Sequence, residues 1–373
     1  MEKDKEHKHH RKIPAVRLAV GGALLLLGGA GWLAARYIPG FADLYGFNVY
    51  PAVVNIFARI SGVFPFSVAE LLVVCGVLLA LTAIVYFIVG LIRKKGRRLR
   101  FLLSSFSSVL LAGGILLFEY VYGMGINYSR TPFSQIAGLD TGKYTVEELR
   151  ETLDWAISSL NSAAAGIETD AQGHVILPDD LSSRAAAAMK KLGAEYAQLD
   201  SYYPRVKPVV LSELMCYGHI TGIFTFYSIE ANYNTRNVPE EIGHTLCHEL
   251  SHMTGFMRED EANFISFLAC RGSEDAYLNY SGWYDITIYL LNAYAGAVSG
   301  EKYAEAYLQM TDTTIRQFEM QSEFWKKYET HFGEVAEVMN DVYLKINDQS
   351  DGTRSYGRVV DLVIADHLKN KMQ

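Results

Sequence analysis

Cysteine is scarce in this chain, with four among 373 residues. Cys75 lies within a long apolar run, which leaves Cys216, Cys247 and Cys270 for the rest of the chain. Three thiols can close one bridge at most, so a fold stapled by several disulfides is excluded. Cys247 adjoins His248, but on a helix it would lie on a different face, and we therefore expect a buried apolar thiol rather than a metal ligand.

Basic charge is scarce beyond the first 100 residues. Residues 1–100 hold 14 Lys or Arg against 5 Asp or Glu, a net charge of +9, whereas residues 101–373 hold 20 against 36, a net charge of −16. An acidic chain segment repels the phosphates of DNA and RNA. We therefore expect no nucleic-acid partner.

Long uncharged runs are present at residues 18–35, 71–92 and 101–118, in a chain that is 50% apolar. Each run is long enough to cross a bilayer as a helix. A signal peptide is the alternative for the first run, but this run ends without a small-x-small cleavage site and is better explained as an uncleaved anchor. Residues 18–122 are therefore predicted to form a three-helix transmembrane region in the lipid bilayer.

The basic segments predict the orientation of these spans. The tail at 1–17 is rich in Lys and Arg, and the loop at 93–100 has six basic side chains in eight positions. Short basic segments stay in the cytoplasm. We therefore predict a multi-pass protein of the cell membrane, with a cytoplasmic and disordered tail at 1–17 and an extracytoplasmic domain at 127–373. Residues 36–70 are interpreted as a loop with an interfacial helix at about 53–60.

The extracytoplasmic segment is long enough for a single globular domain with its own core. Thr145 and Glu148 form a capping-box pattern that opens a helix to about Ala165. The predicted fold class is mainly α with a small β-sheet. We expect strands at 204–211 and 220–234, and further helices at about 181–199, 275–296, 301–347 and 355–369.

The most specific pattern is His248-Glu-Leu-Ser-His252, an H-E-x-x-H motif. Residues four apart lie above one another on a helix, so the two imidazoles can bind one metal ion. Glu249 points to a different side, where its carboxylate can hold a water molecule without binding the metal. Pro239 predicts the start of this helix, and Gly255 predicts its end.

A catalytic zinc takes three protein ligands and keeps one position for water. The spacing is close to that of metzincins, but Arg258 stands where their third histidine would fall, and a guanidinium cannot bind a cation. If a second helix begins near Arg258, Glu259 and Asn263 share a face, with Glu259 as the third ligand and Asn263 as its hydrogen-bonded support. Glu261 points elsewhere and is the alternative ligand.

These residues carry a resemblance to known families. The motif followed by Glu259-x-x-Ala-Asn263 resembles the gluzincin metallopeptidases, although the step from His252 to Glu259 is shorter than in most of them. The wider pattern resembles a bacterial family of unknown function in which three membrane spans precede an extracytoplasmic HExxH domain. The matching segments are 222–224, 230–232, 248–252, 258–264 and 352–357.

The resemblance implies a zincin-like α+β domain and a membrane-anchored zinc metallopeptidase that hydrolyses peptide or protein substrates. Glu249 would be its general base. The family likeness also picks out Tyr356 as a candidate donor to the oxyanion, with His331 and His219 as further candidates.

Three more polar residues near the motif have two interpretations each. Zincin peptidases commonly bind substrate backbone along a strand at the rim of the cleft. Glu230 and Asn232 would share one side of such a strand, either as substrate contacts or as ordinary polar residues at a strand end. His244 lies one turn before His248 and is either part of the site or, more simply, a capping or solvent-exposed histidine.

One other function remains open, and a second is disfavoured by the sequence. A catalytically inactive zincin-like domain could keep the metal site as part of a membrane-bound sensor or an envelope-assembly scaffold with a protein partner. An intramembrane protease would need the motif inside a long apolar run, whereas Glu240, Glu241, Arg258 and Asp260 surround it.

Overall fold

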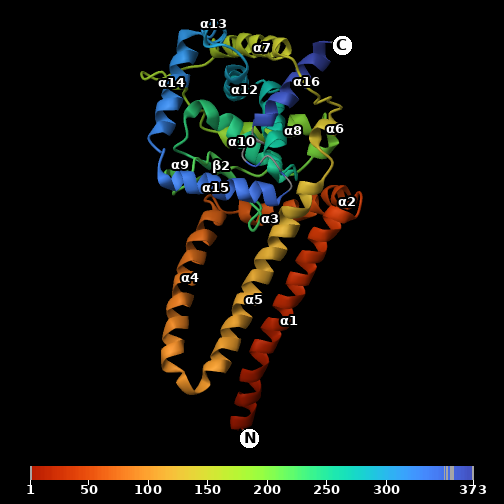
Figure 1. The fold of residues 1–373 in the computed structure, drawn as a ribbon, viewed down its shortest axis with the longest axis vertical. Coiled ribbons are helices and arrows are strands. Elements are labelled where there is room, and N and C mark those ends of the chain that lie inside the picture. Colours follow the sequence, from red (N-terminus) through yellow and green to blue (C-terminus); the bar gives the residue numbers. More distant parts are fainter. Residues whose placement is uncertain (1, 348, 350–351, 353–356, 372–373) are drawn as a thin grey trace.

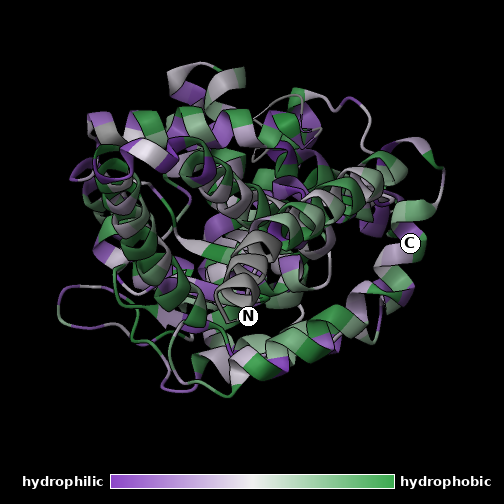
Figure 2. Ribbon diagram, turned by 90° about the horizontal axis from the view of Figure 1, so that it is seen from below, coloured by the Kyte–Doolittle hydropathy of each residue, from purple (hydrophilic) through white to green (hydrophobic). Residues whose placement is uncertain are grey.

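The computed structural model describes residues 2–347, 349, 352 and 357–371. Three long helices extend from one side of a mainly helical body (Figure 1): α1 (Glu2–Tyr37), α4 (Val68–Arg93) and α5 (Arg98–Gly123). In the described part of the chain, three helical segments are long and apolar enough to cross a membrane, at Pro14–Tyr37, Val68–Arg93 and Lys95–Gly123. Hydrophobic residues predominate along these helices (Figure 2). The three predicted apolar spans are therefore confirmed as helices.

The segment expected to be a disordered tail is helical from Glu2 onward. It is rich in Glu, Lys and Arg, which are good helix formers, and it extends a helix that the apolar run already forms. The expectation of disorder was based on the charge of the segment alone. It did not consider that the helix of the apolar run can continue into the segment before it.

α1 and α5 pack closely because glycines lie between them. A Cβ added to Gly114 would lie 2.6 Å from the carbonyl oxygen of Gly21, and a Cβ added to Gly21 would lie 2.9 Å from the backbone of Leu111. Small residues let membrane helices approach in this way. α4 diverges from α5 beyond the turn that joins them (Figure 1), and none of its most apolar stretch is buried.

Two short helices lie where the long helices meet the body: α2 (Phe41–Asn48) and α3 (Tyr50–Gly62). α3 covers the predicted interfacial helix and is longer. α2 was expected to be loop, and its Tyr45 is buried and donates its hydroxyl to the backbone oxygen of Tyr122 on α5. This tertiary contact had no local signal in the sequence.

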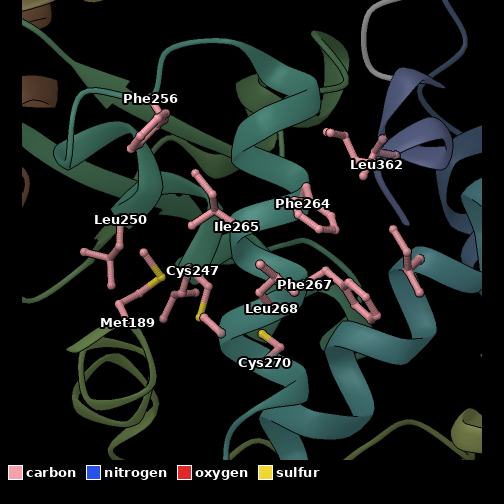
Figure 3. Close-up of a cluster of buried hydrophobic side chains, with 14 of the residues drawn as sticks. Met189, Cys247, Leu250, Phe256, Phe264, Ile265, Phe267, Leu268, Cys270 and Leu362 are labelled. Atoms are coloured by element: carbon pink, nitrogen blue, oxygen red, sulfur yellow. The ribbon is translucent and has the colours of Figure 1, made fainter. Parts of the chain in front are cut away.

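The body is built around α10 (Pro239–Met253) and α11 (Glu259–Arg271), which pack against each other and against α12 (Ala276–Ala297). Apolar side chains from both helices, including Leu250 and Phe267, form part of the core (Figure 3). The remaining helices of the body are α6 (Phe133–Ile136), α7 (Val146–Ala164), α8 (Leu181–Gly193), α9 (Ser212–Tyr217), α13 (Gly300–Tyr307), α14 (Asp312–Lys326), α15 (His331–Ile346) and α16 (Val359–Lys371).

A three-stranded sheet lies beside α10. Its order is β1 (Lys207–Val209), β3 (Glu230–Asn234) and β2 (Gly222–Thr225), with β1 parallel and β2 antiparallel to β3. The single extended segment predicted at 220–234 is thus a hairpin. The hydroxyls of Thr225 and Ser228 form a hydrogen bond of 2.7 Å at its turn. In this strand order, β2 lies at an edge of the sheet.

Most helix boundaries follow local signals. The capping box at Thr145 is present, with hydrogen bonds in both directions between Thr145 and Glu148. The continuous helical segment predicted at 301–347 is three helices, because Thr311 and Thr330 each cap the start of a new one. The fold class, mainly α with a small sheet, is confirmed.

Candidate metal centre

The HExxH motif lies on α10, and the next helix begins six residues after α10 ends. Pro239 is the first residue of α10, as predicted, and Gly255 adopts a left-handed φ of 90° just past its end. A residue with a Cβ is strained in that conformation, so glycine permits the turn. The chain then enters α11, with Arg258 as its N-cap residue and Glu259 as its first helical residue. The turn places Glu259 against the two motif histidines.

His248, His252 and Glu259 point their side chains at one another. The Nε2 atoms of the two histidines are 3.1 Å apart, and Oε2 of Glu259 lies 3.1 Å from Nε2 of His248 and 3.7 Å from Nε2 of His252. A tetrahedral site with metal–nitrogen bonds of 2.0–2.1 Å spaces its ligand atoms about 3.3 Å apart. The three side chains are therefore spaced as ligands of one metal ion.

The outer nitrogen of each histidine is held by an oxygen. Nδ1 of His252 lies 2.8 Å from the carbonyl oxygen of Phe256, and Nδ1 of His248 lies 2.7 Å from Oδ1 of Asn263. Because a carbonyl oxygen only accepts, each Nδ1 carries a proton, and a ring in its neutral form directs the lone pair of Nε2 inward. The predicted supporting role of Asn263 thus appears in the geometry, although its partner is His248 rather than Glu259.

This arrangement directs three electron-pair donors at one point. Two Nε2 lone pairs and a carboxylate oxygen repel one another unless a cation or a proton lies among them. The pKa values show this competition. Burial alone would lower the pKa of His252, but the contact with Glu259 and the charges of Glu259 and Glu249 raise it to about 9. Burial would raise the pKa of Glu259, but both histidines hold it well below its ordinary value. The donor set fits a metal cation.

Glu249 is buried beside this group and is not one of its ligands. Burial raises its pKa to about 8. The charge of His252 acts to lower this pKa, and the charge of Glu259 acts to raise it. Its Oε2 has no hydrogen-bond partner, and a Cβ added to Gly222 of β2 would lie 2.5 Å from its Oε1. The carboxylate thus occupies space that only a glycine at position 222 leaves open.

Glu261, the alternative third ligand, points away from the histidines. Its Oε1 accepts a hydrogen bond of 2.9 Å from the backbone N–H of Phe133, and burial raises its pKa to about 7. Within the described residues, the carboxylate that joins His248 and His252 is that of Glu259.

His244 is on α10 but does not join the ligand group. Its Nδ1 lies 2.9 Å from Oδ2 of Asp285, and its Nε2 lies 3.2 Å from the backbone oxygen of Asn263. The alternative of a capping or solvent-exposed histidine is wrong, because the residue is buried. α12 covers this face of α10 and supplies Asp285, which the sequence pattern around His244 could not reveal.

Glu230 and Asn232 are both buried on the central strand β3. The carboxylate of Glu230 forms an ion pair with Lys207 and accepts hydrogen bonds from the backbone N–H groups of Val68 and Ala69, at 3.3 and 2.7 Å. Its contacts are thus with the start of α4. Nδ2 of Asn232 lies 3.4 Å from the backbone oxygen of Ile223. Both side chains face one side, as predicted.

A reciprocal contact strengthens this junction. Glu70, in the first turn of α4, accepts hydrogen bonds from the backbone N–H groups of Val210 and Leu211, at 2.9 and 2.7 Å. α4 is therefore joined to the sheet by two carboxylates, one from each side.

The three candidate oxyanion donors are not brought to the metal ligands by any described contact. Tyr356 lies outside the described residues. The ring of His219 stacks on Trp325, with ring centroids 5.4 Å apart, and the exposed side chain of His331 pairs with Glu334.

Three tyrosines that the sequence pattern did not indicate are close enough to Glu259 for its charge to act on them. The hydroxyls of Tyr128 and Tyr343 are 3.0 Å apart, and the hydroxyl of Tyr289 accepts a hydrogen bond of 3.3 Å from Nδ2 of Asn263. Burial raises the pKa of each tyrosine, and the charge of Glu259 raises it further. They come from three distant segments in a chain with 24 tyrosines, so no local pattern distinguishes them. Tyr128 lies in a short 3₁₀ helix, Gly125–Ser129, directly after α5, the third helix that is long and apolar enough to cross a membrane.

All three cysteines of the body are free and buried, as expected for Cys247. Cys247 and Cys270 both lie in the core between α10 and α11 (Figure 3).

Comparison with known proteins gives a family but no characterised relative. No curated protein and no solved structure matches the chain. One family model matches residues 45–364, a range that includes α4, α5, the sheet and all the candidate metal ligands. The chain therefore belongs to a protein family of unknown function, DUF3810.

Proposed function

We propose that this protein is a membrane-anchored, zinc-dependent metallopeptidase with a zincin-like domain outside the cytoplasmic membrane. One observation supports the proposal most strongly. Two imidazoles and a carboxylate converge at metal-ligand spacing, and a buried carboxylate that is not a ligand, Glu249, lies beside them. An HExxH peptidase needs both elements.

His248, His252 and Glu259 would hold the ion. Bound zinc supplies a Lewis acid that activates water and polarises the scissile carbonyl. Glu249 would accept a proton at Oε2 from the attacking water and pass it to the leaving amine. A raised pKa suits this role, because a general base works best when its pKa lies near the working pH.

The edge strand β2 provides a place for an extended peptide. It starts at Gly222, next to Glu249, and the ring of Phe224 lies 6.3 Å from the ring of His252, measured between centroids. A substrate chain can pair with such an edge through main-chain hydrogen bonds. Glu230 and Asn232 lie on the central strand, so we assign the substrate edge to β2. Tyr128 and Tyr343 are the candidate donors to the oxyanion.

The orientation follows from charge. The turn between α4 and α5 and the start of α1 are basic, and both lie at the end of the spans opposite the body (Figure 1). Basic segments stay in the cytoplasm. The metal centre would then face the outer surface of the membrane, within reach of peptide segments close to the bilayer.

The test uses the full-length protein in lipid nanodiscs. Wild type and Glu261→Ala are expected to contain one zinc per chain, and Glu259→Ala to contain far less. Against a library of fluorogenic peptides, wild type should cleave at least one member. Glu249→Gln should keep its zinc and lose activity by about 10²–10⁴-fold, the usual contribution of a general base.

The variants also separate the alternatives. Zinc retained without cleavage of any peptide would favour the inactive sensor or scaffold. Equal zinc in Glu259→Ala and loss in Glu261→Ala would overturn the ligand assignment. Full activity in Glu249→Gln would contradict the mechanism.

A further inference from the structure

A cavity lies at the boundary between the long helices and the body. It has a volume of about 450 Å³ and lies between α3, the end of α5 and the turn of the β2–β3 hairpin. Its walls are almost entirely apolar, with Val53 and Phe57 from α3, Phe118 and Tyr122 from α5, and Phe226 and Tyr227 from the turn. Small-molecule sites commonly have volumes of roughly 300–1,000 Å³.

The mouth of this boundary cavity is apolar as well. Leu44, Val49 and Phe57 line the cavity and are exposed, with 62%, 44% and 49% of their surfaces accessible. One wall is formed by the last turns of α5, at the body end of the third helix long enough to cross a membrane. Exposed apolar residues at this height face lipid rather than water. In the orientation proposed above, the cavity would open to the outer leaflet.

The tyrosine hydroxyls around the cavity are directed at the backbone. Tyr45 donates to the backbone oxygen of Tyr122, and Tyr122 donates to the backbone oxygen of Leu27, at 3.2 Å. The hydroxyl of Tyr227 lies 3.5 Å from the backbone oxygen of Ala69. Each tyrosine therefore offers the cavity its apolar ring.

One polar group remains on the wall. Glu119, on α5, is partly buried, and no cation pairs with it in the described part of the chain. A carboxyl in a membrane span without a partner marks a functional position, because such a group is costly to keep in an apolar environment. The carboxyl of Glu119 can pair with a ligand that carries a hydrogen-bond donor or a positive charge.

We propose that the boundary cavity binds one phospholipid of the outer leaflet, with an acyl chain along the apolar walls and an ammonium headgroup at Glu119. The apolar lining accounts for binding of the acyl chain, and the carboxyl of Glu119 accounts for a preference for an ammonium headgroup over an anionic one. The inference rests on the orientation proposed above but does not depend on the metal centre.

The test is photo-crosslinking of the full-length protein in nanodiscs. The probe is phosphatidylethanolamine with a diazirine on its acyl chain, and labelled residues are mapped by mass spectrometry. We expect labels on α3, on the end of α5 and on residues 226–229. Val53→Trp fills the cavity and should lower this labelling about tenfold, equivalent to roughly 1.4 kcal/mol of binding free energy. Ile56→Trp, on an exposed position of the same helix outside the cavity, is the control and should label like wild type.

Two further arms test the parts of the proposal. Leu44→Trp obstructs the mouth at an exposed position and should also lower labelling, which covers the case in which Val53→Trp does not fold. A phosphatidylglycerol probe should label wild type less than the ethanolamine probe, and Glu119→Gln should remove this difference. Equal labelling in the Val53, Leu44 and Ile56 variants would overturn the lipid site, because it would show only general contact with the bilayer. Equal labelling of wild type by both probes would overturn the role of Glu119.

Discussion

Gly222 of β2 lies directly against the carboxylate of Glu249 on α10. A Cβ added at position 222 would lie 2.5 Å from Oε1, 2.8 Å from Cγ and 2.9 Å from Cδ of Glu249. The edge strand and the proposed general base therefore share one space, and a side chain at position 222 must displace the carboxylate. The three heavy atoms nearest to this Cβ thus all belong to Glu249.

The first prediction concerns this contact. Gly222→Ala should lower peptidase activity by about 10²-fold, since a catalytic group misplaced by about 1 Å can cost that much. Zinc content should remain at the wild-type level. Gly296→Ala, where an added Cβ would meet nothing within 4 Å, is the matched control and should be fully active. Wild-type activity in Gly222→Ala would show that Glu249 does not need its present position.

The second prediction concerns the support of His248. Asn263→Ala removes the oxygen that holds Nδ1, and loss of such a partner typically weakens metal affinity about 10–100-fold. Asn263→Asp keeps an acceptor at this position and should restore most of the affinity. Competition with a chelator of known zinc affinity measures both variants. If Asn263→Ala binds zinc as tightly as wild type, the hydrogen bond to His248 has no part in metal binding.

The third prediction concerns the ion pair of Glu230 and Lys207, whose side chains are only 2% and 3% exposed. Glu230→Ala leaves a buried lysine without its partner and frees the N-terminus of α4, so we expect a loss of about 3–5 kcal/mol in unfolding free energy. The double variant Glu230→Leu/Lys207→Met should lose less than Glu230→Ala. Thermal unfolding in detergent measures all of them, with the exposed Glu301→Ala as control. If Glu230 instead contacts substrate, Glu230→Ala should fold normally and lose activity.

The sequence predicted those parts of the site that depend on helical spacing. His248 and His252 lie one turn apart on α10, and Glu259 follows after a turn at Gly255. Their convergence therefore follows from helical spacing and from the φ of Gly255. Glu230 shows the limit of this reasoning. Its partners at positions 68, 69 and 207 come from the start of α4 and from another strand, and no local pattern specifies contacts across such distances along the chain. Tyr128 and Tyr343 were missed for the same reason.

The fold was predictable to a similar extent. Caps and glycines gave most helix boundaries, and uncharged runs gave the three long helices. The hairpin at 222–234 was read as one strand, because Phe226, Tyr227 and Ile229 in its turn have high strand propensity and the segment lacks a central glycine. Propensity alone could not locate that turn.

The last prediction concerns the pH dependence of stability. Glu241 on α10 is buried, and burial together with the charge of Asp285 raises its pKa from 4.5 to about 8. The folded protein therefore binds this proton more tightly than the unfolded chain does. Between pH 4.5 and 8 the folded state holds more protons, so stability falls as pH rises through this window.

Glu241→Gln keeps the shape of the side chain and its contact with Gln321, whose Nε2 lies 2.5 Å from Oε1 of Glu241. It removes the charge that is unfavourable at high pH. In zinc-loaded protein, we expect the melting temperature of wild type to fall from pH 5.5 to pH 8, and that of Glu241→Gln to fall less and to exceed wild type at pH 8. The exposed Glu301→Gln should follow wild type at both pH values. A Glu241→Gln variant that loses as much stability as wild type over this range would show that Glu241 does not titrate there.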